Sequence, residues 1–120
     1  MEQSLTITGQ EKDMDEKDFH ERIERELVRL IMEIRVKKKL SKAEVGRRAF
    51  PDRVRPERKI QAIEKKSYQG KPQKLSLRDA HFLAYAVGEK LHNLLLDARR
   101  VVEKEVEREL ELSEDKNIAS

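Results

Sequence analysis

The sequence contains no cysteine and no tryptophan, and aromatic residues make up only 4% of its 120 residues. The absence of cysteine excludes a disulfide framework, a cysteine-ligated zinc site and thiol catalysis. No apolar run approaches the roughly 18 residues of a membrane span, and the first residues lack the order of a signal peptide. We therefore expect a cytoplasmic protein of one domain, with an aliphatic core and no contact with a membrane.

Motifs for catalysis and metal binding are also missing. The sequence has no glycine-rich phosphate loop and no nucleophile with a base at a known spacing. His81 and His92 lie in helical patterns, but no third ligand stands at metal-binding spacing, so we expect them at surface or packing positions. The sequence predicts no enzymatic activity, no catalytic residues, no cofactor and no bound metal.

Charged residues are abundant and unevenly distributed. They form 42% of the chain, yet the net charge is only +3. Residues 37–74 hold fourteen lysines and arginines against four acids, a charge of +10, whereas residues 1–36 carry −4 and residues 75–120 carry −3. Such a basic segment attracts polyanions. A solvated helical surface without a partner is the alternative reading of charge alone.

Apolar spacing and capping residues predict five helices. A long amphipathic helix is expected over residues 15–38, with acids in its first turn. Ser41 and Glu44 form a capping box at the start of a short helix that ends before Pro51. Gly46 within it indicates that another backbone passes too close for a side chain. Pro56 is placed as the first-turn proline of a third helix, to about residue 66.

Two more helices are expected, over residues 77–88 and from about residue 89 to 112, the first of them capped by Ser76 and Asp79. The last would be about 35 Å long, more than a core of this size covers, so a second copy is expected on its apolar stripe. The alternative to a dimer interface is that this apolar stripe packs in the core of a single chain. The expected dimerisation residues are Leu94, Ala98, Val101, Val102, Val106 and Leu110.

Two short helices inside the most basic segment have the layout of a helix-turn-helix. Three segments carry a more specific likeness: RVKKKLSKAEVGRRA (35–49), IQAIE (60–64) and LSLRDAHFLAYAVGEKLHNLL (75–95). In this order they resemble the XRE or lambda-repressor/Cro-like family over about residues 30–95. The resemblance implies an all-α, five-helix fold that binds duplex DNA as a dimer and performs no catalysis.

The resemblance also implies which residues meet DNA. Lys42 would contact a phosphate at the start of the second helix. The base-reading positions would be Glu57, Arg58, Gln61 and Ala62, with the Arg58 fork suited to guanine. Flexible ammonium groups fit phosphates better than bases. The expected contacts to the phosphates of the DNA backbone are therefore Lys59, Lys66, Lys71 and Lys74. Arg35 and Glu64 would form a structural ion pair.

The link between the second and third helices departs from the family pattern. The family's turn has about three or four residues, whereas this link contains Pro51, Asp52, Arg53, Val54 and Arg55 before Pro56. Arg53 and Arg55 are therefore predicted to reach phosphate or groove from the link. The angle of the recognition helix is left open.

These patterns divide the chain into a flexible tail (1–14), a DNA-binding domain that includes the long first helix (15–95), a dimerising helical extension (96–112) and a second tail (113–120). We expect a sequence-specific transcriptional regulator, a repressor that occupies a promoter as a homodimer on double-stranded DNA. The alternative is an antitoxin or adaptor of the same fold whose main partner is a protein.

Overall fold

The computed structural model describes the backbone of residues 2–119 and the side chains of residues 16–113. Over residues 2–119 it contains five helices and no strand, so the fold is all-α, as the sequence predicts. The helices are α1 (Glu2–Lys37), α2 (Lys42–Ala49), α3 (Pro56–Tyr68), α4 (Leu77–Ala86) and α5 (Leu91–Ala119).

The predicted helix-start signals are present in the structure. The hydroxyl of Ser41 accepts a hydrogen bond from the Glu44 amide at 3.0 Å, and the hydroxyl of Ser76 accepts one from the Asp79 amide at 3.0 Å. These bonds satisfy amides that a helix leaves without a partner in its first turn. Pro56 occupies the first turn of α3, where its missing amide is not needed.

The core is built from small and branched aliphatic side chains of all five helices. Ile31, Val45, Ile60 and Leu83 are completely buried and come from α1, α2, α3 and α4 in turn. Phe50, which follows α2, is the one aromatic side chain among the buried residues of the described part of the chain. This composition agrees with the low aromatic content of the sequence.

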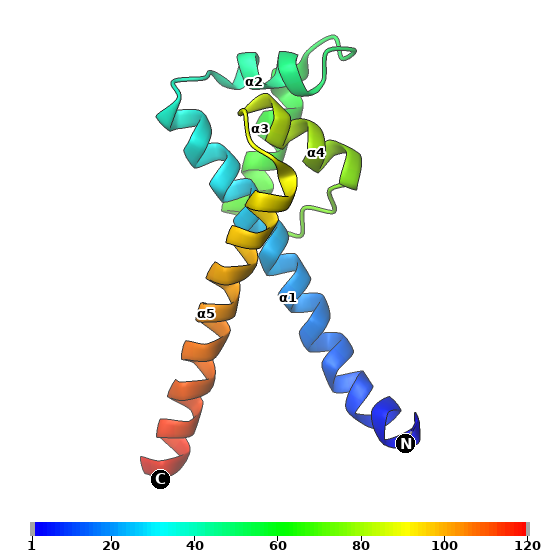
Figure 1. The fold of residues 1–120 in the computed structure, drawn as a ribbon, viewed down its shortest axis with the longest axis vertical. Helices are drawn as coiled ribbons and strands as arrows, with labels where there is room; N and C mark the ends of the chain where they lie inside the picture. Colours follow the sequence, from blue (N-terminus) through cyan, green and yellow to red (C-terminus); the bar gives the residue numbers. More distant parts are fainter. Residues whose placement is uncertain (1, 120) are drawn as a thin grey trace.

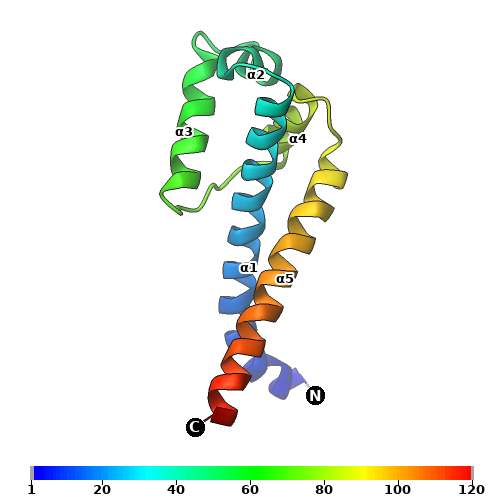
Figure 2. The same ribbon diagram turned by 90° about the vertical axis from the view of Figure 1, so that its left-hand side faces the viewer.

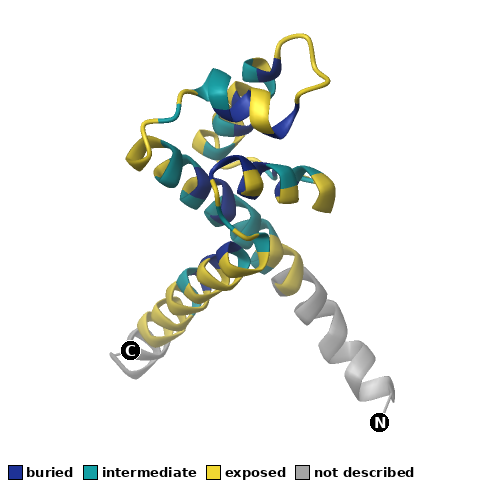
Figure 3. Ribbon diagram, turned by 45° about the horizontal axis from the view of Figure 1, so that its top comes forward, coloured by how far each residue is buried: buried dark blue, intermediate teal, exposed yellow. Residues whose placement is uncertain are grey.

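The helices form a compact head on a crossing pair of long helices (Figures 1 and 2). In the head α3 packs against α1, and α2 packs against α3 and α4. The start of α1 and the end of α5 lie at the opposite end of the molecule (Figure 1). α1 and α5 are antiparallel, cross below the head and then separate toward the two ends. The link between α2 and α3 lies at the far side of the head and is exposed along residues 51–55 (Figure 3).

The pairing of α5 with α1 corrects part of the predicted dimer interface. Leu94, Ala98 and Val102 are 3%, 0% and 1% exposed within one chain. They pack in the core rather than on a second copy, since the N-terminal half of α5 is covered by α1 and the head. Val101 and Val106 are half-buried, and Leu110 is exposed.

The two long helices also extend further than the apolar periodicity indicates. α1 begins at Glu2 instead of near Asp15, and α5 ends at Ala119 instead of near Leu112. The side chains of residues 1–15 and 114–120 lie outside the described residues, so the predicted flexibility of the two tails and the domain boundaries stay predictions. Arg22 joins the two helices, with its guanidinium 2.9 Å from Glu105 and 3.0 Å from Glu109.

Candidate nucleic-acid interface

The position of α3 is set by a close backbone contact with α2. A Cβ atom at Gly46 would lie 2.8 Å from the carbonyl carbon of Pro56 and 2.9 Å from the amide nitrogen of Glu57. The prediction that another backbone passes too close for a side chain is therefore confirmed, and the neighbour is the first turn of α3. Ile60 and Ile63 hold the inner side of α3 in the core.

The other side of α3 faces solvent. Arg58, Gln61 and Ala62 are exposed, and Glu57 is partly exposed. Three-residue and four-residue steps along the helix place these four side chains on a single face. The four positions predicted to read bases thus form one accessible surface, which begins at the first turn of α3.

The predicted ion pair between Arg35 and Glu64 has a third member. An Nη atom of Arg35 lies 3.8 Å from Glu64 Oε2, and its other Nη donates to the Leu40 carbonyl at 3.0 Å. Lys42 Nζ approaches Glu64 more closely, at 2.8 Å from Oε1. The cluster therefore joins α1, α2 and α3. Glu64 thus offsets part of the charge of Lys42, which the resemblance assigns to a phosphate.

Lys59 differs more strongly from its predicted role. Its Nζ lies 2.8 Å from Asp79 Oδ2 and 4.4 Å from the centre of the Phe50 ring, and its side chain is only 21% exposed. The ammonium thus connects α3 to α4, and a phosphate at Lys59 would compete with both contacts. The structure therefore gives Lys59 a structural contact, and its phosphate contact stays a prediction.

The remaining predicted phosphate contacts are accessible. Arg53, Arg55, Lys66, Lys71 and Lys74 are all exposed. The two arginines lie in the link before α3, and the lysines lie at the end of α3 and in the loop after it. Exposed cations thus lie at both ends of the exposed face of α3.

Other basic residues of the head are paired within α2. The Glu44 carboxylate contacts Arg47 at 2.5 Å and Arg48 at 3.1 Å. The hydrogen bond from Arg47, followed by the charges of both arginines, lowers the pKa of Glu44 below its ordinary value. Glu44 is therefore ionised at neutral pH and offsets part of the positive charge on this helix.

Gln73 is a structural residue that sequence reasoning missed. It is 3% exposed in the loop between α3 and α4, and its amide group donates to the Ile63 carbonyl at 2.9 Å. Arg25 donates to the Gly70 carbonyl at 2.9 Å and ties the same loop to α1. No sequence signal marks Gln73, because polar loop residues are ordinarily exposed.

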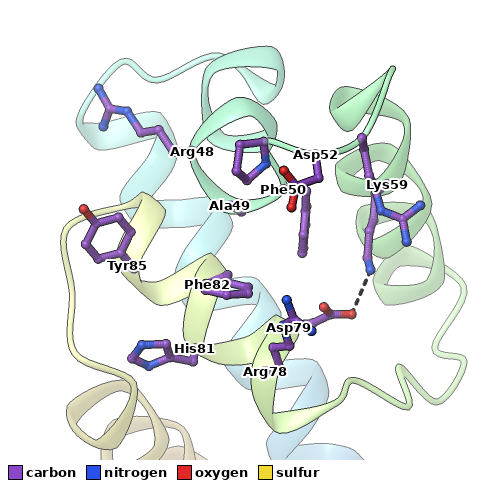
Figure 4. Close-up of a pocket in the computed structure, with 12 residues that line it drawn as sticks. Arg48, Ala49, Phe50, Asp52, Lys59, Arg78, Asp79, His81, Phe82 and Tyr85 are labelled. Atoms are coloured by element: carbon purple, nitrogen blue, oxygen red, sulfur yellow. Dashed lines mark hydrogen bonds and ion pairs between the residues drawn. The ribbon is translucent and has the colours of Figure 1, made fainter.

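An aromatic hollow of about 510 Å3 lies between the end of α2, the link and α4 (Figure 4). Phe50 and Phe82 face it, Tyr85 stands at one side, and the pair of Lys59 and Asp79 closes another. The guanidinium carbon of Arg78 lies 5.5 Å from the centre of the Phe82 ring. His81 and His92 are exposed, in agreement with their predicted surface positions.

Among the side chains that the structure describes, no three histidines or acids are grouped so as to hold a metal ion. Along the described part of the chain, no helix combines the length and the apolar character that crossing a membrane requires. Comparison with family models, with curated proteins and with solved structures finds no match to this chain.

Proposed function

We propose that this chain is a sequence-specific DNA-binding regulator of transcription, in which α2 and α3 act as a helix-turn-helix of the lambda-repressor-like kind. The exposed face of α3 carries this proposal. Arg58 and Gln61 stand on it beside Ala62, and the segment of +10 charge contributes exposed cations around it. The Arg58 guanidinium offers two parallel donors to the O6 and N7 atoms of guanine, and Gln61 matches adenine. Without an effector domain in the described helices, the simplest action is repression by occupying a promoter.

A dimer is the second part of the proposal. α1 and α5 separate beyond the head and leave a hollow of about 530 Å3. Its lining combines three apolar side chains, Phe19, Val106 and Leu110, with four charged ones, Glu16, Asp18, Arg22 and Glu109. A second copy would cover these apolar side chains. Binding to one face of duplex DNA would then require the two recognition helices to lie about 34 Å apart, one turn of the duplex. The two copies together would read a two-fold symmetric site.

Selection of bound sites from a random duplex library at near-physiological salt tests this function. We expect a two-fold symmetric site to be enriched, and we expect Arg58→Ala to relax the choice of one base in each half-site, because it removes a bidentate contact worth about 1–3 kcal/mol. Arg100→Ala is the matched control, since it removes an exposed arginine from α5, away from the exposed face of α3. The control variant should select the wild-type site.

Weak and uniform binding without enrichment would contradict the proposal. It would favour the alternative of an antitoxin or adaptor, for which the aromatic hollow offers an apolar surface to a protein partner.

The structural contact of Lys59 with Asp79 gives a second prediction. Lys59→Met should lower the free energy of unfolding by about 1 kcal/mol, because Asp79 loses its ion-pair partner and the Phe50 ring loses the cation beside it.

Lys66→Met is the contrasting variant. It should leave the free energy of unfolding unchanged, but it should reduce the slope of log affinity against log salt concentration by about 0.9, because one phosphate contact is lost. Urea unfolding and titrations at several salt concentrations measure both quantities. The reverse pattern would return Lys59 to the phosphate contacts.

A further inference from the structure

The link between α2 and α3, residues 50–55, presents an unusual apolar tip. Val54 is 96% exposed, more than any other large apolar side chain that the structure describes. Arg53 and Arg55 flank it and are also exposed. Because Val54 buries almost nothing, the fold gains no stability from an apolar side chain at this position.

The link is held in shape despite its exposure. Proline stands at its second residue and directly after its last one, and each ring fixes one backbone angle. The Arg53 amide donates to the Phe50 carbonyl at 3.1 Å, which closes a turn at the start of the link. At the other end Pro56 is buried against Gly46. A link constrained in this way loses little conformational freedom when it binds a partner.

An open hollow of about 490 Å3 separates the link from α3. Arg53, Val54 and Arg55 line it from the link, and Arg58, Lys59 and Ala62 line it from the helix. Arg58 and Ala62 also belong to the exposed face of α3, so the hollow and the recognition surface are continuous.

The charge of the hollow is largely uncompensated. Across residues 16–113 the ion pairs include none of Arg53, Arg55 and Arg58. Three guanidinium groups without a carboxylate partner favour an anionic chain between the link and the helix. The small side chain of Ala62 lets such a chain approach the helix closely.

We propose that the link is a second reading element for DNA. This inference rests on the proposed function and adds to it a residue that determines specificity. One strand of the duplex lies in the hollow, Arg53 and Arg55 hold its phosphates, and Val54 contacts the C5-methyl group of a thymine. A valine side chain forms no hydrogen bond, and thymine is the base that presents a methyl group in the major groove.

The test uses the site selected by the wild-type protein, with each thymine replaced in turn by deoxyuridine, which lacks only that methyl group. At one thymine in each half-site we expect wild-type affinity to fall about fourfold, the effect of one buried methyl group. Val54→Ala changes both protomers of the proposed dimer, so it should bind the unmodified site about 16-fold more weakly, about fourfold for each half-site, and show no further loss on this substitution. Because Val54 is exposed, the variant folds normally.

Val36→Ala is the matched control, since Val36 is an exposed valine on α1, 62% accessible, outside the hollow. It should keep the wild-type response to deoxyuridine. If wild type and Val54→Ala respond equally at every thymine, or the selected site needs no thymine, the inference about Val54 is wrong while the proposed function stands. If no duplex is enriched at all, both are wrong.

Discussion

Replacing Gly46 by valine is expected to lower the free energy of unfolding by about 3 kcal/mol or more. The first added atom would already lie 2.8–2.9 Å from three backbone atoms of Pro56 and Glu57. Backbone atoms cannot rotate away as the end of a side chain can, so α2 and α3 must move apart. The two further carbons of valine enlarge this displacement. Urea unfolding followed by helical circular dichroism measures the loss.

Alanine at the same position separates two opposing effects. It improves helix propensity by about 1 kcal/mol, whereas the contact of its Cβ with the α3 backbone costs about 1–3 kcal/mol. We therefore expect Gly46→Ala to be destabilised, but less than Gly46→Val. DNA affinity should fall further than stability alone explains, since the displaced helix carries Arg58.

Gly70→Ala is the matched control for both variants. Gly70 has a φ of +66°, and nothing lies within 4 Å of an added Cβ, so only the backbone conformation opposes the substitution. We expect a cost of about 1 kcal/mol. A Gly46→Val protein as stable as Gly70→Ala would show that α2 and α3 are not held by this contact.

The head of the molecule is the part that sequence patterns describe best. Ser41 and Ser76 mark helix starts through bonds that span only three residues, and such local bonds can be recognised in a sequence. Gly46 is informative for a related reason. An unfavourable residue in a helix interior needs a cause, and close approach of another backbone is a common one.

The side-chain partners of the same region depend on contacts that the sequence does not display. In a complete capping box the acid at the third position bonds back to the cap, but Glu44 instead binds Arg47 and Arg48. Asp79 likewise binds Lys59, which lies 20 residues away in the chain. Lys59 therefore cannot be distinguished from an exposed lysine until the fold places α3 beside α4.

The long helices show a different limit. Apolar periodicity reports burial rather than helix formation, so it locates the part of α1 that packs on the head and not the start at Glu2. In α5 the same stripe serves two environments. Leu94 and Ala98 face the core, whereas Leu110 lies beyond it. A periodic pattern does not show at which residue of α5 the buried part of the stripe ends and the exposed part begins.

Leu110→Glu is expected to convert the proposed dimer into monomers and to lower affinity for a symmetric DNA site by about 100-fold, the contribution of linking two binding modules. Leu110 is 60% exposed in one chain and lines the hollow between α1 and α5, so a glutamate there is compatible with a folded monomer. In a two-fold interface each substitution is present twice, and the two added carboxylates would lose water beside Glu16, Asp18 and Glu109, the acids that already line the hollow.

Leu96→Glu introduces the same charge on the same helix and provides the control. Leu96 is 48% exposed on the half of α5 that lies beside the head, outside the hollow. Sedimentation of both variants should give a monomer for Leu110→Glu and a dimer for Leu96→Glu, with equal helix content. A Leu110→Glu protein that still sediments as a dimer would place the interface elsewhere. A wild-type protein that is already monomeric would mean that Phe19, Val106 and Leu110 contact a different partner. The adaptor function would then explain the separated ends of α1 and α5 better than binding to a symmetric DNA site does.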